Sequence, residues 1–520
     1  MEQRTLQLLQ QPSAYPEPTN SVQLVQTHVS FIFITDNFAY KIKKPVDFGF
    51  LNFTTLDRRR FYCNEEVRLN RRLCPGIYLG VVEVRESLTA ASFDGEGKVI
   101  DYAVKMKRLP DERMLDRLLQ RQEVTDGDIR RIARAVANFH LDAERSELID
   151  SFGSRESIGR NWEENFQQIA EFSPLIIAKR DLQLIRDWVD NFLTDKCELF
   201  AERISGGFIR DCDGDIHTGN ICLTDNVCIF DCIEFNSRFR YSDAAADIAF
   251  LLMDFDLHGC PDFSDIFLDE YIAVTGDRQI DQVLDFYKVY RAVVRGKVES
   301  FRLHDADVPR KAKEEARERA ISYFQLARGY IIRRRLPPTM IITCGLIGSG
   351  KSTIARKLSL QLGIEKLSSD HVRKELAGVP TYSHAAAEYG TGMYRPEMNE
   401  ATYDELLTRA ERVLASGCSV IIDASFRTRR DRDRFRALAR RFSVPFYIIM
   451  TSSPEPEIRK RLSERLTSPA EASDGRWELF GKQKEEFEPV GADESEQICL
   501  DTSIPLPDTI DRILDKLGIL

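Results

Sequence analysis

Apolar and polar residues follow two different periods along the chain. Between residues 21 and 44 they alternate around an Asp36-Asn37 pair, which predicts a β-hairpin. From 55 to 73 apolar residues recur at helical spacing, and alternation returns at 77–84 and 98–109. We therefore expect residues 1–110 to form a small sheet with one helix.

Helical spacing dominates from residue 111 to 335, interrupted by a turn-rich hairpin at 206–236. An apolar stripe at 129–140 includes His140, which we expect to be a packed histidine. A charged helix then ends before the prolines at 337 and 338, and this predicts a domain boundary at 335. From 336 to 520 apolar strands alternate with helices, which is typical of a parallel α/β sheet.

Composition narrows the class of protein. At 520 residues the chain exceeds what one hydrophobic core supports, and a net charge of −10 disfavours a general nucleic-acid binder. No apolar run reaches the length of about 18 residues that a membrane helix needs. We therefore expect a cytoplasmic protein of several domains without a membrane partner.

The 11 cysteines are expected to be reduced thiols, because the chain opens without an apolar leader. Disulfides are accordingly not expected. Cys212, Cys222, Cys228 and Cys232 lie close together in the sequence, but none forms a CxxC pair. Buried thiols are favoured over a zinc site.

A phosphate-binding motif follows the apolar run MIITC. GLIGSGKS at 345–352 fits G-x-x-x-x-G-K-[ST] and precedes a helical pattern. Glycines let backbone amides approach phosphate oxygens, Lys351 is expected to reach the β and γ phosphates, and Ser352 to ligate Mg²⁺. The segment expected to bind ATP comprises Gly345, Leu346, Ile347, Gly348, Ser349, Gly350, Lys351, Ser352 and Thr353.

A second apolar strand, CSVIID, ends in Asp423 and has the form of a Walker B segment. Its carboxylate would hold Mg²⁺ or a water on the metal; the alternative is a strand-end aspartate without a ligand. ATP and Mg²⁺ are thus the expected cofactors.

The segment KLSSDHVRKELAG resembles P-loop kinases that phosphorylate hydroxyls of small molecules or nucleic-acid 5′ ends. The resemblance implies that Asp370 is the base that binds the acceptor; without it, Asp370 is a helix cap. EIRKRLSERL resembles the lid of that family, which assigns Arg465, or as second choice Arg461, to the phosphates. The arginine-rich stretch 427–441 is interpreted as a solvated helix face rather than a nucleic-acid grip.

Residues 211–236 supply a second set of candidate groups. Asp215 and Asn220 lie five apart in a loop, and Asp231 ends a later strand. Phosphoryl transfer of the protein-kinase kind needs a carboxylate for the hydroxyl proton, plus an amide and a second carboxylate for Mg²⁺. As bare residues in loops, these three are equally compatible with ordinary turn chemistry.

This loop is similar to the catalytic loop H-G-D-x-H-x-x-N of aminoglycoside phosphotransferase-like and choline-kinase-like enzymes. The resemblance makes Asp215 the catalytic base and Asn220 and Asp231 the metal ligands, with His217 shaping the loop. Asp213 departs from the pattern because it stands where the family has histidine.

The same resemblance makes the small sheet a nucleotide-covering lobe. Lys41 is placed like the strand lysine that contacts the α and β phosphates, with Lys43 on the same face as the alternative. Glu65 is expected to be its partner rather than Glu66, because Glu65 lies nearer the apolar face of Phe61, Tyr62, Leu69 and Leu73. The order of segments resembles bifunctional aminoglycoside phosphotransferase-like/ATP-binding proteins.

The predicted fold is multidomain: a two-lobe protein-kinase-like domain of the α+β class (1–110 and 111–335), then a P-loop NTPase domain with a parallel α/β sheet (336–520). The expected function is ATP-dependent phosphotransfer to the hydroxyl of a small molecule at two sites. One alternative makes the N-terminal domain a non-catalytic sensor that regulates the C-terminal kinase. Others are a nucleic-acid 5′-end kinase and aminoglycoside resistance. The acceptor and the oligomeric state stay open.

Overall fold

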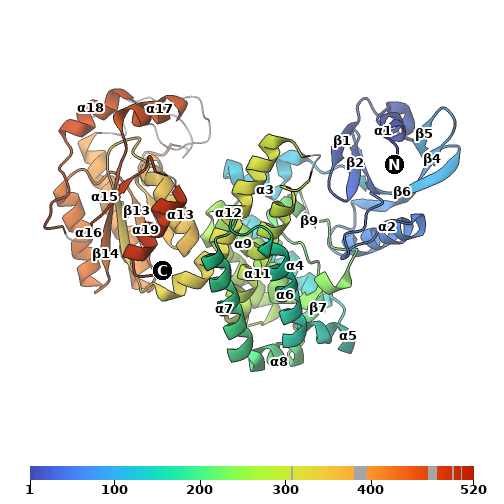
Figure 1. Cartoon of the computed structure of the whole chain (residues 1–520), viewed down its shortest axis with the longest axis horizontal. Coiled ribbons are helices and arrows are strands. Elements are labelled where there is room, and N and C mark those ends of the chain that lie inside the picture. The colour runs from blue at the N-terminus through green and yellow to red at the C-terminus, as the bar shows by residue number, and fades with distance from the viewer. Residues whose placement is uncertain (306–307, 380–394, 466–476, 495–496, 505, 520) are drawn as a thin grey trace. The chain divides into compact units, whose positions relative to one another are not determined.

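The chain forms two compact units, Met1–Ile321 and Ser322–Leu520. The computed structural model describes residues 1–305, 308–379, 395–465, 477–494, 497–504 and 506–519 (Figure 1). The division between the units falls inside helix α12 (Arg310–Ile332), upstream of the boundary predicted at 335. The limits at 110 and 335 stay predictions.

A six-stranded antiparallel sheet opens the first unit, in the order β1-β2-β3-β6-β4-β5 (Figure 1). Its strands are β1 (Gln23–Gln26), β2 (Ser30–Ile34), β3 (Phe38–Lys43), β4 (Tyr78–Glu86), β5 (Ala91–Phe93) and β6 (Lys98–Lys107). The predicted hairpin is formed by β2 and β3, where Ile34 pairs with Ala39. Residues 23–26 lie within the predicted hairpin but form a separate strand, which pairs with β2. Helix α1 (Gln3–Leu9) precedes the sheet, and α2 (Leu56–Asn70) packs against β4 and β6.

Helices make up most of the rest of this unit. They are α3 (Leu115–Arg121), α4 (Asp126–Asp142), α5 (Glu147–Asp150), α6 (Arg155–Ala170), α7 (Lys179–Asp195), α8 (Cys197–Ser205), α9 (Ala244–His258), α10 (Pro261–Thr275) and α11 (Asp281–Phe301). Two short antiparallel pairs interrupt them: β7 (Ile209–Asp211) with β10 (Tyr241–Asp243), and β8 (Ile221–Leu223) with β9 (Val227–Ile229). Residues 244–255 of α9 are all buried and most of them are apolar, as expected for a helix in a core.

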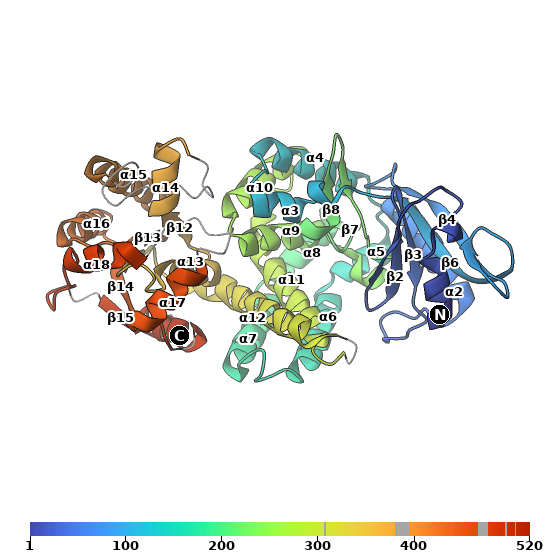
Figure 2. The ribbon, with the colours of Figure 1, turned by 90° about the horizontal axis from the view of Figure 1, so that it is seen from above.

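The second unit contains a five-stranded parallel sheet in the order β12-β13-β11-β14-β15. Its elements are β11 (Met340–Cys344), α13 (Lys351–Leu362), β12 (Glu365–Ser368), α14 (Ser369–Leu376), α15 (Pro396–Ala415), β13 (Val420–Asp423), α16 (Arg429–Arg441), β14 (Phe446–Ser452), α17 (Glu455–Arg465), α18 (Trp477–Glu485), β15 (Gln497–Asp501) and α19 (Leu506–Lys516). Helices α15 and α16 lie on one side of the sheet and α13 and α19 on the other (Figures 1 and 2). The predicted parallel α/β sheet is confirmed.

The carboxyl ends of parallel strands meet at one edge of a sheet, and loops at that edge form the usual binding site of such folds. Here that edge carries the loop after β11, the turn from β12 into α14 and the end of β13. Among the described residues, no helix combines the length and apolar character needed to cross a bilayer.

Candidate active sites

The loop from Gly345 to Gly350 connects β11 to the first turn of α13. Its glycines are required by the local geometry, since Gly350 has φ +92° and a Cβ on Gly345 would lie 2.5 Å from the carbonyl oxygen of Thr451. Gly350 caps α13, so the loop ends at a helix N-terminus, where backbone amides favour an anion. The loop therefore fits the phosphate groups of a nucleotide.

One side chain of β14 and one just after β15 hold this loop. The Ser349 and Thr451 hydroxyl oxygens lie 2.7 Å apart, and the Thr502 hydroxyl donates to the Ser349 carbonyl oxygen at 2.9 Å. Lys351 donates to the Leu346 carbonyl oxygen at 2.8 Å. The motif gave no signal for Thr451 or Thr502, because both lie over 100 positions further along the chain.

The start of the phosphate loop contacts helices α17 and α18. The Ile347 N–H donates to the side-chain oxygen of Gln483 on α18 at 3.2 Å. Leu346 and Ile347 also pack against an apolar cluster that includes Phe480. Thr353 lies in the first turn of α13, half-buried. The start of the loop is thus covered by α17 and α18.

Ser352 and Asp423 meet at the carboxyl edge of the sheet, where the predicted metal site lies. The Ser352 hydroxyl lies beside Asp423, which is 5% exposed at the end of β13, and helps to lower the pKa of that carboxyl. Burial raises the pKa of Asp423, and the ammonium groups of Lys366 and Lys351 offset this only in part. A divalent cation would favour the ionised carboxylate, so a hydroxyl beside a buried carboxylate fits Mg²⁺. Lys366 was missed in the sequence because a strand lysine carries no motif.

Asp370 lies in the first turn of α14, close enough to Asp423 to help raise the pKa of that carboxyl. Its carboxylate accepts from Arg373 at 2.9 Å, and Arg373 also donates to Asn399 at 3.3 Å. The Asp370 side chain remains 29% exposed, so one side of the carboxylate faces solvent.

Of the two arginines predicted for the lid, only Arg461 has a side chain that the structure describes. The side chain of Arg465 lies outside the described residues. Arg461 donates to the hydroxyl and the carbonyl oxygen of Thr502, at 3.0 and 2.9 Å. Thr502 in turn holds Ser349, so Arg461 contacts a residue that holds the phosphate loop.

In the first unit, Lys41, Glu66 and Asp231 converge from three elements. The Lys41 ammonium lies 2.9 Å from Glu66 on α2 and 2.5 Å from Asp231, which follows β9. Asp231 has φ +67°, and its N–H donates to the Tyr78 hydroxyl at 3.2 Å. This turn directs its carboxylate toward the lysine.

The choice of Glu65 as the partner of Lys41 is wrong. Glu65 pairs with Arg68 on the outer face of α2, whereas Glu66 is fully buried. The apolar residues that suggested the inner face of α2 do not all lie on it, since Phe61 is 58% exposed. The buried face instead carries Arg59, Cys63, Glu66, Val67 and Asn70, among others.

Asp215 and Asn220 lie together in the loop between β7 and β8. The Asn220 amide donates to the Asp215 carboxylate at 3.1 Å, and the Phe230 N–H donates to the Asn220 carbonyl oxygen at 3.0 Å. The second bond places Asn220 next to the strand that leads to Asp231. His217 lies 3.7 Å from Asp215, and burial lowers the pKa of His217.

Two aspartates of α9 hold this loop, and neither was singled out in the sequence. Asp247 accepts from the N–H groups of Asp213 and Gly214 at 2.9 and 2.8 Å. Asp254, two turns further on, accepts from the Thr218 N–H at 3.0 Å. Acids seven residues apart in an otherwise apolar helix were the signal that could have revealed them.

His140 is packed, as predicted, with 3% of its surface exposed. It contacts the Tyr271 hydroxyl at 2.8 Å and Asp247 at 3.1 Å. Burial and the neighbouring Asp247 raise the pKa of Asp213 well above its ordinary value, which favours the neutral form of this carboxyl. The neutral form lets an aspartate lie beside the Asp247 carboxylate at the position expected to hold histidine.

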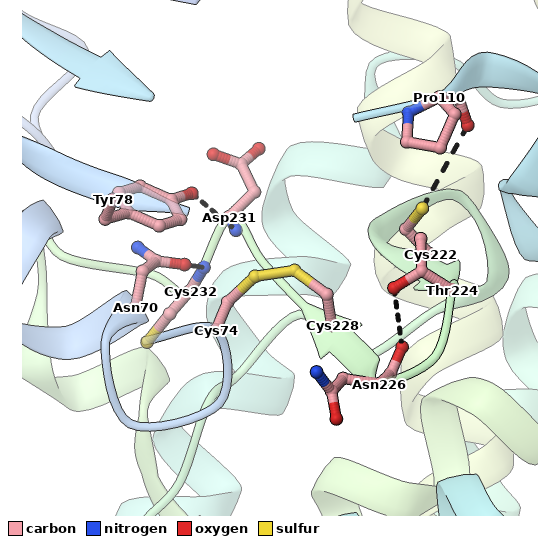
Figure 3. The surroundings of a disulfide bond; sticks show 10 residues. All are labelled: Asn70, Cys74, Tyr78, Pro110, Cys222, Thr224, Asn226, Cys228, Asp231 and Cys232. Carbon is pink, nitrogen blue, oxygen red and sulfur yellow. Dashed lines mark hydrogen bonds between the residues drawn. A yellow bond between two sulfur atoms is a disulfide. The ribbon is translucent and has the colours of Figure 1, made fainter. Parts of the chain in front are cut away.

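The expectation of reduced thiols is wrong for one pair. Cys74, just after α2, and Cys228, on β9, form a disulfide with Cα atoms 4.9 Å apart (Figure 3). A separation of 154 residues concealed the pair in the sequence. The remaining thiols of the four-cysteine group, those of Cys212, Cys222 and Cys232, are buried as expected.

A protein of Mycobacterium tuberculosis (strain ATCC 25618 / H37Rv), "Uncharacterized protein Rv2004c", is 31% identical over 424 residues, which are 81% of this chain and 81% of that protein. The chain belongs to the Rv2004c family. A Mycobacterium bovis member, "Uncharacterized protein Mb2027c", matches to the same extent. In the chain described here, residues 340–490 match the sequence model of the AAA domain.

Other similarities are confined to part of the chain. The shikimate kinase of Legionella pneumophila (strain Paris) is 33% identical over 147 residues, 28% of this chain and 78% of that enzyme. A sugar kinase structure from Janibacter sp. HTCC2649 aligns at 24% identity with a TM-score of 0.27, covering 35% of this chain and 96% of that one. The AAA domain match and the phosphate loop on a parallel sheet give the C-terminal region a P-loop kinase-like α/β fold.

Proposed function

We propose that the P-loop domain transfers the γ-phosphoryl group of ATP to a hydroxyl of a small molecule. The observation that carries this proposal is the gathering of Lys351, Ser352, Asp423 and Asp370 at the carboxyl edge of the parallel sheet. Similarity to a protein named shikimate kinase supports a small acceptor.

Each group has a role that its surroundings support. Backbone amides of the loop and Lys351 would bind the phosphates, and Ser352 and Asp423 would hold Mg²⁺, which neutralises charge on them. Asp370, held by Arg373 with one side toward solvent, would accept the proton of the acceptor hydroxyl. Catalysis would consist mainly of positioning and charge neutralisation.

The test incubates the full-length protein with γ-labelled ATP, Mg²⁺ and a pooled metabolite extract. We expect a labelled small-molecule product, lost in Lys351→Ala and reduced on the order of 10²–10⁴-fold in Asp370→Asn. Lys516→Ala, on the exposed side of α19, is the matched control and should leave the product unchanged. The proposal is contradicted if every labelled product survives Lys351→Ala.

A second phosphotransfer site in the N-terminal unit is favoured by the convergence of Lys41, Glu66 and Asp231 beside the Asp215–Asn220 loop. Lys41 would contact phosphates, Asn220 and Asp231 would hold Mg²⁺, and Asp215 would accept the hydroxyl proton. Calorimetry should then find two equivalents of Mg-ATP per chain. If Asp215→Asn leaves every labelled product intact while both equivalents still bind, the N-terminal unit is a sensor.

The nucleic-acid alternative receives no support from α16. Four of its outward arginines are paired with carboxylates: Arg429 with Asp493, Arg430 with Glu400, Arg434 with Asp404 and Arg441 with Glu411. Paired cations leave little net positive charge for a phosphate backbone. We therefore propose a small-molecule acceptor, and a labelled oligonucleotide product would overturn that choice.

A further inference from the structure

Two lysines, not one, project from the same face of β3 into the cluster around Glu66. Lys41 is 13% exposed at its side chain, whereas Lys43 is only 1% exposed. Each lysine takes one oxygen of the Glu66 carboxylate, Lys41 at 2.9 Å and Lys43 at 2.6 Å. Glu66 is thus clamped between two cations at different depths.

Lys43 has a second carboxylate partner, Glu234, whose side chain is 7% exposed. Glu234 lies three residues after Asp231, so the Lys43–Glu234 ion pair ties the segment carrying Asp231 to β3. The same segment is held by two further contacts: Tyr78 accepts from the Asp231 N–H, and Asn70 of α2 accepts from the Cys232 N–H at 2.9 Å (Figure 3). Among the residues that the structure describes, Lys43 is the only cation at ion-pair distance from both Glu66 and Glu234.

Lys41 and Lys43 differ in how far they are exposed to solvent, which indicates different roles. Lys41 faces Asp231, whose side chain is 47% exposed, and so lies at the open side of the cluster. Lys43 lies behind it, with its ammonium 5.0 Å from the centre of the Phe53 ring. Lys41 is therefore the lysine that a bound phosphate would contact, whereas Lys43 is enclosed.

We propose that Lys43 and Glu234 are positioning residues for the N-terminal nucleotide site, fixing Glu66 and the 231–234 segment so that Lys41 is held at the phosphates. This inference rests on the proposed second function. Without the Lys43 ammonium, Glu66 and Glu234 would be buried carboxylates short of one cation, and such groups rearrange or take up protons. Glu66 would then hold Lys41 less firmly, and Lys41 would bind phosphate less well.

The experiment measures Mg-ATP affinity by calorimetry in full-length Lys351→Ala protein, in which the C-terminal site is silenced. We expect one equivalent to bind, and Lys41→Met and Lys43→Met each to weaken it on the order of tenfold. The decisive variant is the double mutant, because a residue that acts through Lys41 adds no loss once Lys41 is gone. Lys43→Arg should restore part of the affinity.

Two further variants complete the experiment: one can replace Lys43→Met and the other is a control. Glu234→Gln keeps the shape of the side chain and should reproduce the loss of Lys43→Met, which covers the case in which Lys43→Met does not fold. Lys105→Met is the matched control: Lys105 is a half-buried lysine of β6 paired with Glu17, and it should leave affinity unchanged.

The failures are distinguishable. If the Lys351→Ala protein binds no Mg-ATP, the second proposed function falls and this inference with it. If it binds Mg-ATP and Lys41→Met weakens binding, but Lys43→Met and Glu234→Gln do not, only the inference falls. Losses that add fully in the double mutant would assign Lys43 a merely structural role and also overturn it.

Discussion

The Lys41 ammonium lies 2.5 Å from the Asp231 carboxylate, although 190 positions separate the two residues. The contact joins β3 of the antiparallel sheet to the turn that follows β9. Glu66 completes it from α2, so three elements of the first unit meet at one cation. The contribution of this ion-pair cluster to the stability of the first unit can be measured.

Glu66→Gln should destabilise the first unit more than Glu65→Gln. Glu66 is buried between two lysines, and breaking a buried ion pair costs on the order of 3 kcal/mol. The neighbouring Glu65 pairs with the exposed Arg68, a surface pair worth less than about 1 kcal/mol. Hydrogen exchange of peptides from α2 and β3 gives the comparison, and equal protection in both variants would refute it.

Reducing the Cys74–Cys228 disulfide should lower the free energy of unfolding of the first unit by about 3 kcal/mol, because the bond closes a long loop. Thermal unfolding with and without a dithiol reductant measures this, and Cys228→Ser should be insensitive to the reductant. Cys197→Ser, at an exposed free thiol of the same unit, is the control. Finding all 11 cysteines reactive in unfolded, unreduced protein would show that the bond is absent.

Asp213→Asn should flatten the pH dependence of stability of the first unit. The folded-state pKa of Asp213 lies well above its ordinary value, first through burial and then through Asp247. Its contribution is therefore fully present below the unfolded pKa of about 4 and is lost as the pH rises through the folded pKa. Asparagine mimics the neutral acid at every pH, so unfolding measured from pH 4 upward should show a smaller decline in the variant. An unchanged decline would contradict the assignment.

Glu494→Gln should destabilise the second unit at neutral pH but not in acid. Burial alone would raise the pKa of Glu494, but hydrogen bonds from Arg432, the Gly491 N–H and Arg436 outweigh it and lower the pKa to about 2. This stabilisation is present above the unfolded pKa and disappears as the pH falls toward 2. We expect a loss on the order of 3 kcal/mol at pH 7.

The check is denaturant unfolding of the second unit at pH 7 and at the lowest pH at which it still folds, where the difference between the Glu494→Gln variant and the parent should shrink. Glu411→Gln, in an exposed pair with Arg441, serves as control and should have little effect at either pH. A deficit of the same size at both pH values would mean that the carboxylate charge contributes nothing.

Local features of this protein could be predicted from its sequence. The phosphate loop at 345–352 depends on a strand, a turn that requires glycine and a helix N-terminus, all within a few neighbouring residues. The β2–β3 hairpin and the parallel sheet followed from hydrophobic periods for the same reason. Asp215 and Asn220, five apart in one loop, also proved to be in contact.

Tertiary structure decided which residue of a local pair faces the site and which distant groups reach it. Helix α2 has two adjacent glutamates, and only its packing against β4 and β6 selected Glu66 over Glu65. The Lys43–Glu234 pair, the Asp247 and Asp254 contacts and the Cys74–Cys228 bond each join segments that no period relates. Periodicity records which face of an element is apolar, whereas the rotation of that face and the partners it meets depend on side chains far away in the sequence.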